Sequence, residues 1–150
     1  MTKKLSPSSV LFCCDNNSIR SPIAEGLMKK QFGTSIYAQS VGVESDLEID
    51  GFAIAVCKEI DVELSRHQVR SFDDMEKLGE HMIAFDVIIA LSKASYHKVL
   101  QIASDKNIEI IYWPIKDPVF KSERREEKLT VYRLIRNQLQ GLITEAFIRK

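Results

Sequence analysis

A cysteine and an arginine stand six positions apart near the start of the chain, and a serine follows the arginine directly. The stretch reads Cys14-Asp15-Asn16-Asn17-Ser18-Ile19-Arg20-Ser21. A thiolate is a strong nucleophile, and a guanidinium group can bind two oxygens of one phosphate. A thiol and a guanidinium in one short loop therefore indicate chemistry on a phosphate group or a similar oxyanion.

The elements on either side of this loop support that interpretation. Residues Ser9–Cys14 (SVLFCC) form a continuous apolar run, which predicts a buried strand. A helix should follow, with Ser21 as its N-cap, Pro22 at its first position and Gly33 at its end. The amides and the dipole at such a helix start bind anions and stabilise a thiolate. Cys14 is therefore the expected nucleophile, with Arg20 holding the phosphate.

Two further side chains have candidate roles in this chemistry. The Ser21 hydroxyl can donate to the thiolate and ease its departure, although a helix N-cap alone also explains a serine there. Asp117 lies in the segment WPIKDP, after an expected strand, where its carboxyl group can protonate a leaving oxygen. An isolated Asp-Pro pair is equally typical of a simple turn.

The rest of the chain alternates short apolar runs with helical patterns, which favours a parallel sheet. The whole chain, residues 1–150, is expected to be one α/β domain: a twisted, four-stranded parallel sheet with helices on both faces. The expected strands are residues 9–14, 35–43, 85–91 and 108–113. The expected helices are residues 21–33, 51–62, 93–104, a short one within 65–81, and a long amphipathic one after 121–127.

Composition excludes several classes of protein. Lys plus Arg equals Asp plus Glu at 21 each, so no overall field attracts nucleic acid or a membrane surface. The longest apolar runs, such as Val87–Leu91, are far shorter than the roughly 20 residues of a membrane span. The N-terminal segment has no secretory pattern, and three cysteines suit reduced thiols better than a disulfide framework. We therefore expect a cytoplasmic protein.

The stretch VLFCCDNNSIRSPIAEG, with Asp117-Pro118 late in the chain, resembles the low molecular weight protein tyrosine phosphatases and the related thioredoxin-coupled arsenate reductases. The segments SVG at 40–42, SRH at 65–67 and FDVIIALS at 85–92 extend the resemblance over nearly the whole chain. It implies a phosphatase-like fold and a phosphocysteine intermediate. By this resemblance, Cys14 is the nucleophile, Arg20 binds the phosphate and Asp117 is the general acid. Ser21 helps the thiolate to leave, and Asn17 holds the loop in shape. The amides of residues 15–20 bind the oxyanion.

The chain departs from the tyrosine phosphatase pattern at the pocket. Asn16 replaces a frequent glycine and tolerates a positive φ better than most residues. The Asp15 carboxylate should oppose both the thiolate and a phosphate dianion. Val119 and Phe120 stand where the family usually has tyrosines, and Phe120 is the candidate wall for an aromatic substrate.

Two alternatives stay open. Arsenate reduction needs two further relay cysteines after the third strand, and IALSKASYHKV has none there. Cys57 falls in a helical pattern typical of a buried thiol, and Cys13 should point to the opposite face from Cys14. The loop can also serve a non-catalytic phosphate-binding module.

No cofactor or metal is expected, because the chain lacks glycine-rich nucleotide motifs and His67, His81 and His97 lack partners at ligand spacing. His67 is interpreted as a residue that fixes a loop. The expected partners are a phosphorylated protein or small phosphate ester as substrate, with inorganic phosphate or another oxyanion in the loop. Nucleic acid and membranes are not expected, and the chain should be a monomer or weak dimer.

Overall fold

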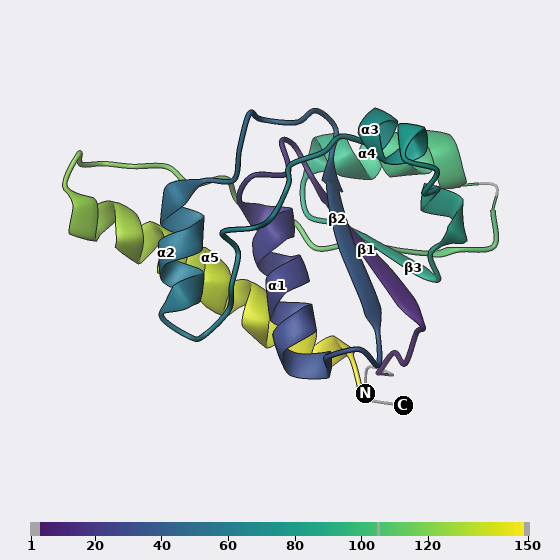
Figure 1. Cartoon of the computed structure of the whole chain (residues 1–150), viewed down its shortest axis with the longest axis horizontal. Helices are drawn as coiled ribbons and strands as arrows, with labels where there is room; N and C mark the ends of the chain where they lie inside the picture. The colour runs from purple at the N-terminus through teal and green to yellow at the C-terminus, as the bar shows by residue number, and fades with distance from the viewer. Residues whose placement is uncertain (1–3, 105, 149–150) are drawn as a thin grey trace.

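The computed structural model describes residues 4–104 and 106–148. Residues 1–3, part of the N-terminal segment on which the expectation about export rests, lie outside the described residues. Four parallel strands form one sheet with the order β2-β1-β3-β4 (Figure 1). Their bounds are β1 Ser9–Cys14, β2 Tyr37–Gly42, β3 Val87–Ala90 and β4 Glu109–Tyr112. The predicted α/β class, with a single domain and a four-stranded parallel sheet, is confirmed.

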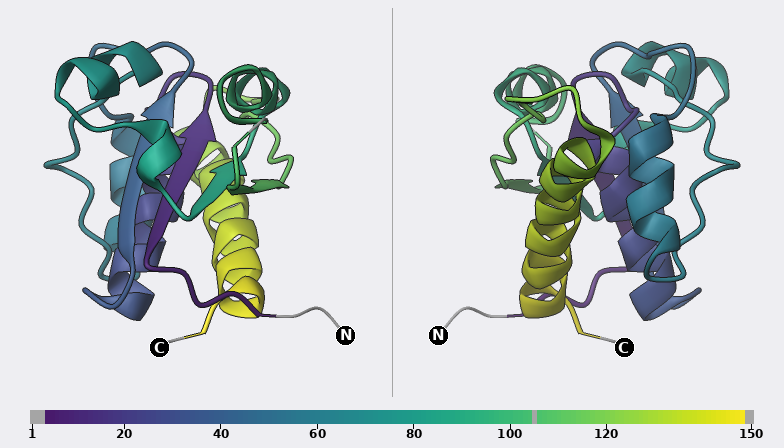
Figure 2. Two further views of the ribbon diagram at one scale, coloured as in Figure 1. Left: turned by 90° about the vertical axis from the view of Figure 1, so that its right-hand side faces the viewer. Right: turned by 90° about the vertical axis from the view of Figure 1, so that its left-hand side faces the viewer.

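Helices cover both faces of this sheet, as predicted. Helices α1, α2 and α5 pack on one face and α3 and α4 on the other, which the two views of Figure 2 show from opposite sides. The helical segments are α1 Arg20–Phe32, α2 Gly51–Lys58, α3 Phe72–Lys77, the 3₁₀ turn η1 Met82–Ala84, α4 Lys93–Ala103 and α5 Arg125–Ala146. No helix among the described residues is long and apolar enough to span a membrane.

The start of α1 corrects one prediction. Ser21 is not the N-cap, because the helix begins at Arg20 and Ile19 precedes it without any side-chain capping hydrogen bond. The Ser21 hydroxyl turns toward the loop instead. By contrast, Asp50 caps α2: its carboxylate accepts hydrogen bonds from the amides of Phe52 and Ala53.

The alternation of side chains along β1 divides the core into two clusters. Val10, Phe12 and Cys14 lie in the cluster that β1 shares with α1, α2 and α5. Leu11 and Cys13 lie in the cluster on the opposite face, so the prediction that Cys13 points away from Cys14 is confirmed. Each such apolar side chain, when fully buried, contributes about 1.5–3 kcal/mol to stability.

The strand order creates a topological switch point at the carboxyl end of β1. After β1 the chain crosses to β2 on one side, whereas β3 pairs with β1 on the other side. Loops leaving neighbouring strands in opposite directions open a crevice at the carboxyl edge of such a sheet. Cys14 is the last residue of β1 and therefore lies at this crevice.

Candidate active site

The loop from Cys14 to Arg20 connects the end of β1 to the first turn of α1. Its backbone bends through a left-handed conformation at Asn17, where φ is 54°. We expected the positive φ at Asn16, and the structure corrects this by one position. Asparagine is among the residues that enter this region most readily, so a glycine is not required.

Four carbonyl oxygens of this loop point away from the pocket. The carbonyls of residues 14, 15, 16 and 18 accept hydrogen bonds of 2.9–3.1 Å from the amides of residues 43, 44, 46 and 50. Within the described part of the chain, none of the N–H groups of residues 15–19 donates to another residue. The loop therefore presents amides to an anion at the start of a 13-residue helix.

Gly42 allows segment 43–50 to approach the loop so closely. A Cβ atom at this position would lie 2.7 Å from the Asn17 amide nitrogen and 2.3 Å from the Glu44 carbonyl oxygen. Those distances are shorter than van der Waals contact, so only glycine fits. Sequence reasoning did not find this supporting role of Gly42 and of the segment that follows it.

Cys14 faces the side chain of Ser21 across the pocket. Its Sγ lies 2.9 Å from Ser21 Oγ, and both side chains are buried. Asn17 Nδ2 donates to the same hydroxyl oxygen at 2.9 Å, so the Ser21 proton can point either at the sulfur or at the Val41 carbonyl oxygen, which lies 3.4 Å from Oγ. The structure thus brings together three of the residues that the sequence singled out.

Arg20 is buried and is held at three points. Its Nη1 donates to the Ile115 carbonyl at 2.8 Å, and its Nη2 lies 3.1 Å from Asp15 Oδ2 and 3.3 Å from Asp117 Oδ1. The other Asp15 oxygen, Oδ1, is buried and has no hydrogen-bond partner among the described residues. The guanidinium that would clamp a phosphate is therefore shared by two carboxylates.

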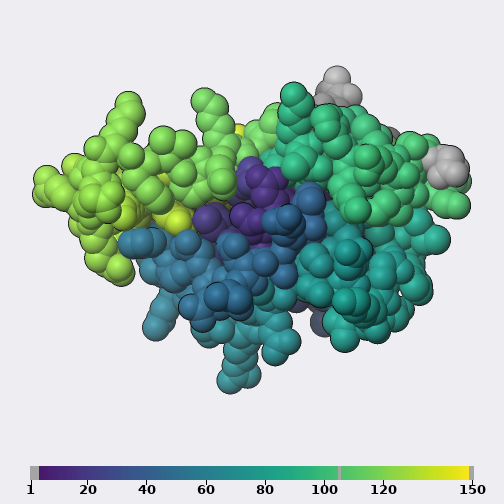
Figure 3. All heavy atoms as spheres, turned by 90° about the horizontal axis from the view of Figure 1, so that it is seen from above, coloured from purple at the N-terminus to yellow at the C-terminus, as the bar shows by residue number. Residues whose placement is uncertain are grey.

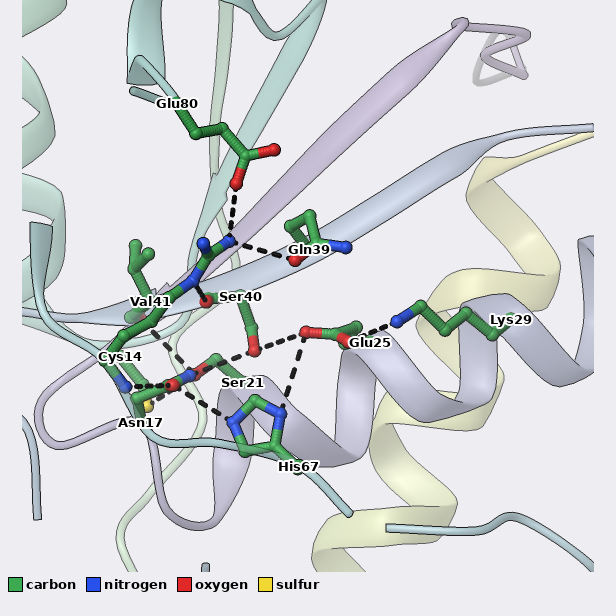
Figure 4. Close-up of polar contacts among 11 residues, drawn as sticks. Cys14, Asn17, Ser21, Glu25, Lys29, Gln39, Ser40, Val41, His67 and Glu80 are labelled. Atoms are coloured by element: carbon green, nitrogen blue, oxygen red, sulfur yellow. Dashed lines mark hydrogen bonds and ion pairs between the residues drawn. The ribbon is translucent and has the colours of Figure 1, made fainter. Parts of the chain in front are cut away.

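A buried network of polar side chains fixes the position of Asn17 in the loop (Figure 4). Asn17 Nδ2 also donates to Ser40 Oγ at 3.0 Å, and the Ser40 hydroxyl donates to Glu25 at 2.6 Å. Asn17 Oδ1 accepts from the Arg70 amide at 2.9 Å and lies 3.0 Å from His67 Nε2. The expected loop-fixing role of His67 thus has a direct contact in the structure.

The environment of His67 disfavours its charged form. Burial lowers the pKa of His67, and the Lys29 and Arg70 charges lower it further, although Glu25 and the Asn17 hydrogen bond oppose this. The second ring nitrogen, Nδ1, lies 4.0 Å from Glu25 Oε1, which is too long for a hydrogen bond. A neutral ring with its proton on Nε2 suits this arrangement, because Asn17 Oδ1 is an acceptor.

Sequence reasoning did not find Ser40, Glu25 or Arg70, which complete the network. Ser40 and Glu25 are fully or nearly fully buried polar residues, and Arg70 also donates to the Ser40 carbonyl. A usable signal for Glu25 was that it is the only charged residue in the stretch SPIAEGLM, residues 21–28. No local pattern connects Arg70 to the loop, because its contacts span more than fifty residues.

The pocket enclosed by these elements has a volume of about 110 Å³. Cys14, Arg20 and Asp117 line it together, with Asn16, Ser18, Ile19, Asp46 and Asp50. The Ser18 hydroxyl donates to Asp46 at 2.7 Å and fixes that carboxylate at the entrance. Phe120 is not part of this lining: its ring stacks on Tyr132 with centroids 5.8 Å apart, although the side chain stays 38% exposed.

The two other cysteines are buried away from the pocket lining. Burial raises the pKa of the Cys57 thiol to about 12, although the Arg136 charge opposes this. Burial, with a smaller contribution from Cys14, also raises the pKa of the Cys13 thiol well above its ordinary value. The prediction of a buried core thiol at Cys57 is confirmed.

A sheet with this order and a loop that holds a thiol and an arginine at the end of its first strand define an α/β protein whose site suits cysteine chemistry on an oxyanion. The sequence profile described as low molecular weight phosphotyrosine protein phosphatase matches residues 9–148, so the chain belongs to that family. The resemblance noted from the sequence is confirmed.

Individual relatives in this family carry different names. An arsenate reductase from Halalkalibacterium halodurans is 28% identical over 93% of this chain and 91% of its own length. A solved arsenate reductase in the phosphate binding state is 25% identical, covers 91% of this chain and 94% of its own, and has a TM-score of 0.68. The arginine phosphatase YwlE from Geobacillus stearothermophilus has a TM-score of 0.72 at 23% identity, over 92% and 89% of the two chains.

Proposed function

We propose that this chain is a cysteine-dependent phosphatase that hydrolyses phosphate monoesters, with phosphotyrosine in proteins as its substrate. The observation that carries the proposal is the shared pocket: a thiol, a guanidinium and a carboxyl group line one space, beside loop amides that donate to no other described residue. Phosphoryl transfer depends mainly on such positioning and charge stabilisation, and it requires no resident cofactor here.

In the first step, Cys14 Sγ attacks phosphorus in line with the bond to the leaving oxygen. A sulfur–phosphorus bond forms as the phosphorus–oxygen bond breaks, and Asp117 gives its proton to the leaving oxygen. Arg20 exchanges its contacts with Asp15 and Asp117 for two phosphate oxygens, and the loop amides bind the negative charge. The product of this step is phosphocysteine.

In the second step, water attacks the phosphorus atom and Asp117 takes its proton. The sulfur–phosphorus bond breaks, phosphate leaves, and the Cys14 thiolate returns. The Ser21 hydroxyl, 2.9 Å from the sulfur, stabilises that thiolate by donating to it. All of these groups come from one chain and need a reduced thiol, so we propose a monomer or weak dimer acting in the cytoplasm.

Arsenate reduction is the second candidate, because curated relatives of this chain are arsenate reductases. That reaction needs thiols able to take over the oxidation from the first cysteine. The chain has only three cysteines, and burial raises the pKa of both Cys13 and Cys57, so neither readily forms the thiolate that would attack. These features favour the phosphatase.

The test is a substrate panel run on the purified protein and on a Cys14→Ser control. It compares p-nitrophenyl phosphate, phosphotyrosyl, phosphoseryl and phosphoarginyl peptides, and arsenate with thioredoxin as reductant. We expect phosphate release from the aryl phosphate and the phosphotyrosyl peptide, and none from the control. Turnover of arsenate without phosphate release would replace the phosphatase with a reductase.

A second variant tests the role of Asp117. Asp117→Asn should lower kcat about 100-fold or more on substrates with poor leaving groups, and least on p-nitrophenyl phosphate, whose leaving group needs little protonation. Unchanged rates on poor leaving groups would remove Asp117 from the mechanism. Binding of a phosphotyrosine analogue without release above the Cys14→Ser control would show a phosphate-binding module instead of an enzyme.

A further inference from the structure

A second cavity lies beside the catalytic pocket, on the other side of Arg20. Its volume is about 480 Å³, compared with about 110 Å³ for the catalytic pocket. Arg20 and Asp117 line both spaces, and Asp15 borders the second one. Any group in this cavity is therefore adjacent to the residues that would hold the phosphate.

The walls of the cavity are mainly apolar. They include Leu91 directly after β3, Ala94 in the first turn of α4, Tyr112 at the end of β4, and Pro114 and Ile115 after it. Tyr112 is 38% exposed, and its ring stacks on Tyr96 with centroids 4.6 Å apart. This surface suits the aliphatic part of a side chain.

The unpaired charges at the cavity are positive. Lys93 and Lys116 line it, and neither forms an ion pair with another described residue. Before substrate binds, Arg20 contacts both carboxylates at its border, Asp15 and Asp117. Once Arg20 binds phosphate and Asp117 carries the proton that it gives to the leaving oxygen, Asp15 is the one negative charge among the described residues that border the cavity, against the two lysines. A carboxylate that enters the cavity thus meets two available ammonium groups.

On the opposite side of the catalytic pocket, the described charged side chains without ion-pair partners are acidic. Segment 44–50 carries Glu44, Asp46, Glu48 and Asp50, and none of the four forms an ion pair with another described residue. Figure 3 looks onto this face, where the purple phosphate loop reaches the surface between the blue segment 44–50 and the green chain that follows β3 and β4. An acidic residue of a substrate is repelled from one side and attracted to the other.

We propose that this cavity binds the side chain of a glutamate or aspartate that lies close in sequence to the phosphorylated residue of a polypeptide substrate. The carbon atoms of that side chain pack on the apolar walls, and its carboxylate pairs with Lys93 and Lys116. The inference rests on the proposed function, because it places the phosphate of the same substrate in the Cys14 loop.

The test compares phosphotyrosyl peptides that differ only in having glutamates or lysines at the positions flanking phosphotyrosine. For the unaltered protein, kcat/KM should be about three- to tenfold higher with the glutamate peptide, since two exposed ion pairs are worth that much. The double variant Lys93→Gln/Lys116→Gln should bring the ratio close to one. The matched variant Lys98→Gln, on the same helix but outside the cavity lining, should leave the ratio unchanged.

A cavity-filling variant tests the apolar contact separately. Ala94→Trp places an indole in the cavity at an exposed helix position, so kcat/KM for the glutamate peptide should fall while that for p-nitrophenyl phosphate stays the same. Ile102→Trp, about 12 Å further along α4, is the control for an added indole. Equal losses on both substrates, or a preference for the lysine peptide, would overturn the inference.

Binding to the Cys14→Ser protein separates this inference from the proposed function. If the protein releases no phosphate from any substrate, the phosphatase proposal fails, but calorimetry with the same two peptides still measures the preference. A tighter complex with the glutamate peptide, lost in Lys93→Gln/Lys116→Gln, would support the cavity as an acidic-residue site. Equal affinity for the two peptides would refute it.

Discussion

The Ser21 hydroxyl lies 2.9 Å from Cys14 Sγ and is oriented by a hydrogen bond from Asn17. Because the oxygen accepts from Asn17, its single proton can point at the sulfur and stabilise a thiolate, and the sulfur is nearer than the other acceptor in reach, the Val41 carbonyl oxygen at 3.4 Å. Hydrogen bonds to charged groups are worth about 1.5–3 kcal/mol, or roughly 10- to 100-fold in a rate.

Ser21→Ala should therefore slow the hydrolysis of phosphocysteine about 10- to 100-fold, because the departing thiolate loses its donor. In rapid-quench experiments with p-nitrophenyl phosphate, the variant should show a burst of p-nitrophenol followed by a slow steady state. Ser21→Thr keeps the hydroxyl and serves as the matched control. Equal steady-state rates for the alanine and threonine variants would show that the hydroxyl has no role in turnover.

Asp15 should weaken oxyanion binding, because its carboxylate occupies Arg20 Nη2 at 3.1 Å and must be displaced. Removing this charge in Asp15→Asn or Asp15→Gly should tighten vanadate or phosphate binding about 3- to 30-fold, after allowance for the 42% exposure of the Asp15 side chain. The inhibition constant for vanadate is the measurement, with Asp73→Asn on the surface of α3 as the control. Unchanged inhibition would mean that the carboxylate does not compete with the anion.

The fold could be predicted from the sequence because its signals are local. Continuous apolar runs marked β1 and β3, a weaker alternation marked β2, and helical spacing marked most of the helices. The boundaries were less certain, since Ser21 resembles an N-cap but the helix begins at Arg20. There the Ser21 hydroxyl contacts Cys14 Sγ and Asn17 Nδ2 and makes no capping hydrogen bond, and both contacts depend on the three-dimensional course of the loop.

In the candidate site, too, sequence reasoning found the residues marked by local patterns and missed those that depend on contacts between distant segments. The residues of one loop, Cys14–Ser21, were found together because they are contiguous, and Asp117 was found because it lies just beyond the fourth expected strand. Gly42, Glu25 and Arg70 were missed because they act through contacts between distant segments. The sequence also placed the left-handed residue at Asn16, whereas the backbone turns at Asn17, where four side-chain hydrogen bonds stabilise the turn.

Gly42→Ala tests the close approach beneath the phosphate loop. The added Cβ would meet the Glu44 carbonyl oxygen and the Asn17 amide nitrogen, which are both backbone atoms and can yield only if the loop moves. We expect a loss of about 1–3 kcal/mol in the free energy of unfolding, and a fall in kcat/KM.

Gly141→Ala is the control for this substitution, because nothing lies within 4 Å of the Cβ it would add and the residue is inside α5. That variant should gain up to about 1 kcal/mol with unchanged activity. Denaturant unfolding and p-nitrophenyl phosphate hydrolysis measure both effects. A Gly42→Ala protein as stable and active as the unaltered protein would show that the loop tolerates a shift.

His67 should make the stability of the protein depend on pH. Burial lowers its pKa in the folded state below the ordinary value of 6.5, so the unfolded chain binds the proton more readily. The stability that neutral His67 contributes is therefore fully present above about pH 6.5 and is lost as the pH falls toward the lowered pKa.

Urea unfolding at pH 7.5, 6.5 and 5.5 should show a decline in the free energy of unfolding that is smaller in His67→Gln, whose amide keeps a donor for Asn17. His97→Gln, at an exposed position of α4, should retain the full decline. Parallel declines in the His67→Gln and unaltered proteins would show that protonation of this ring does not limit stability in acid.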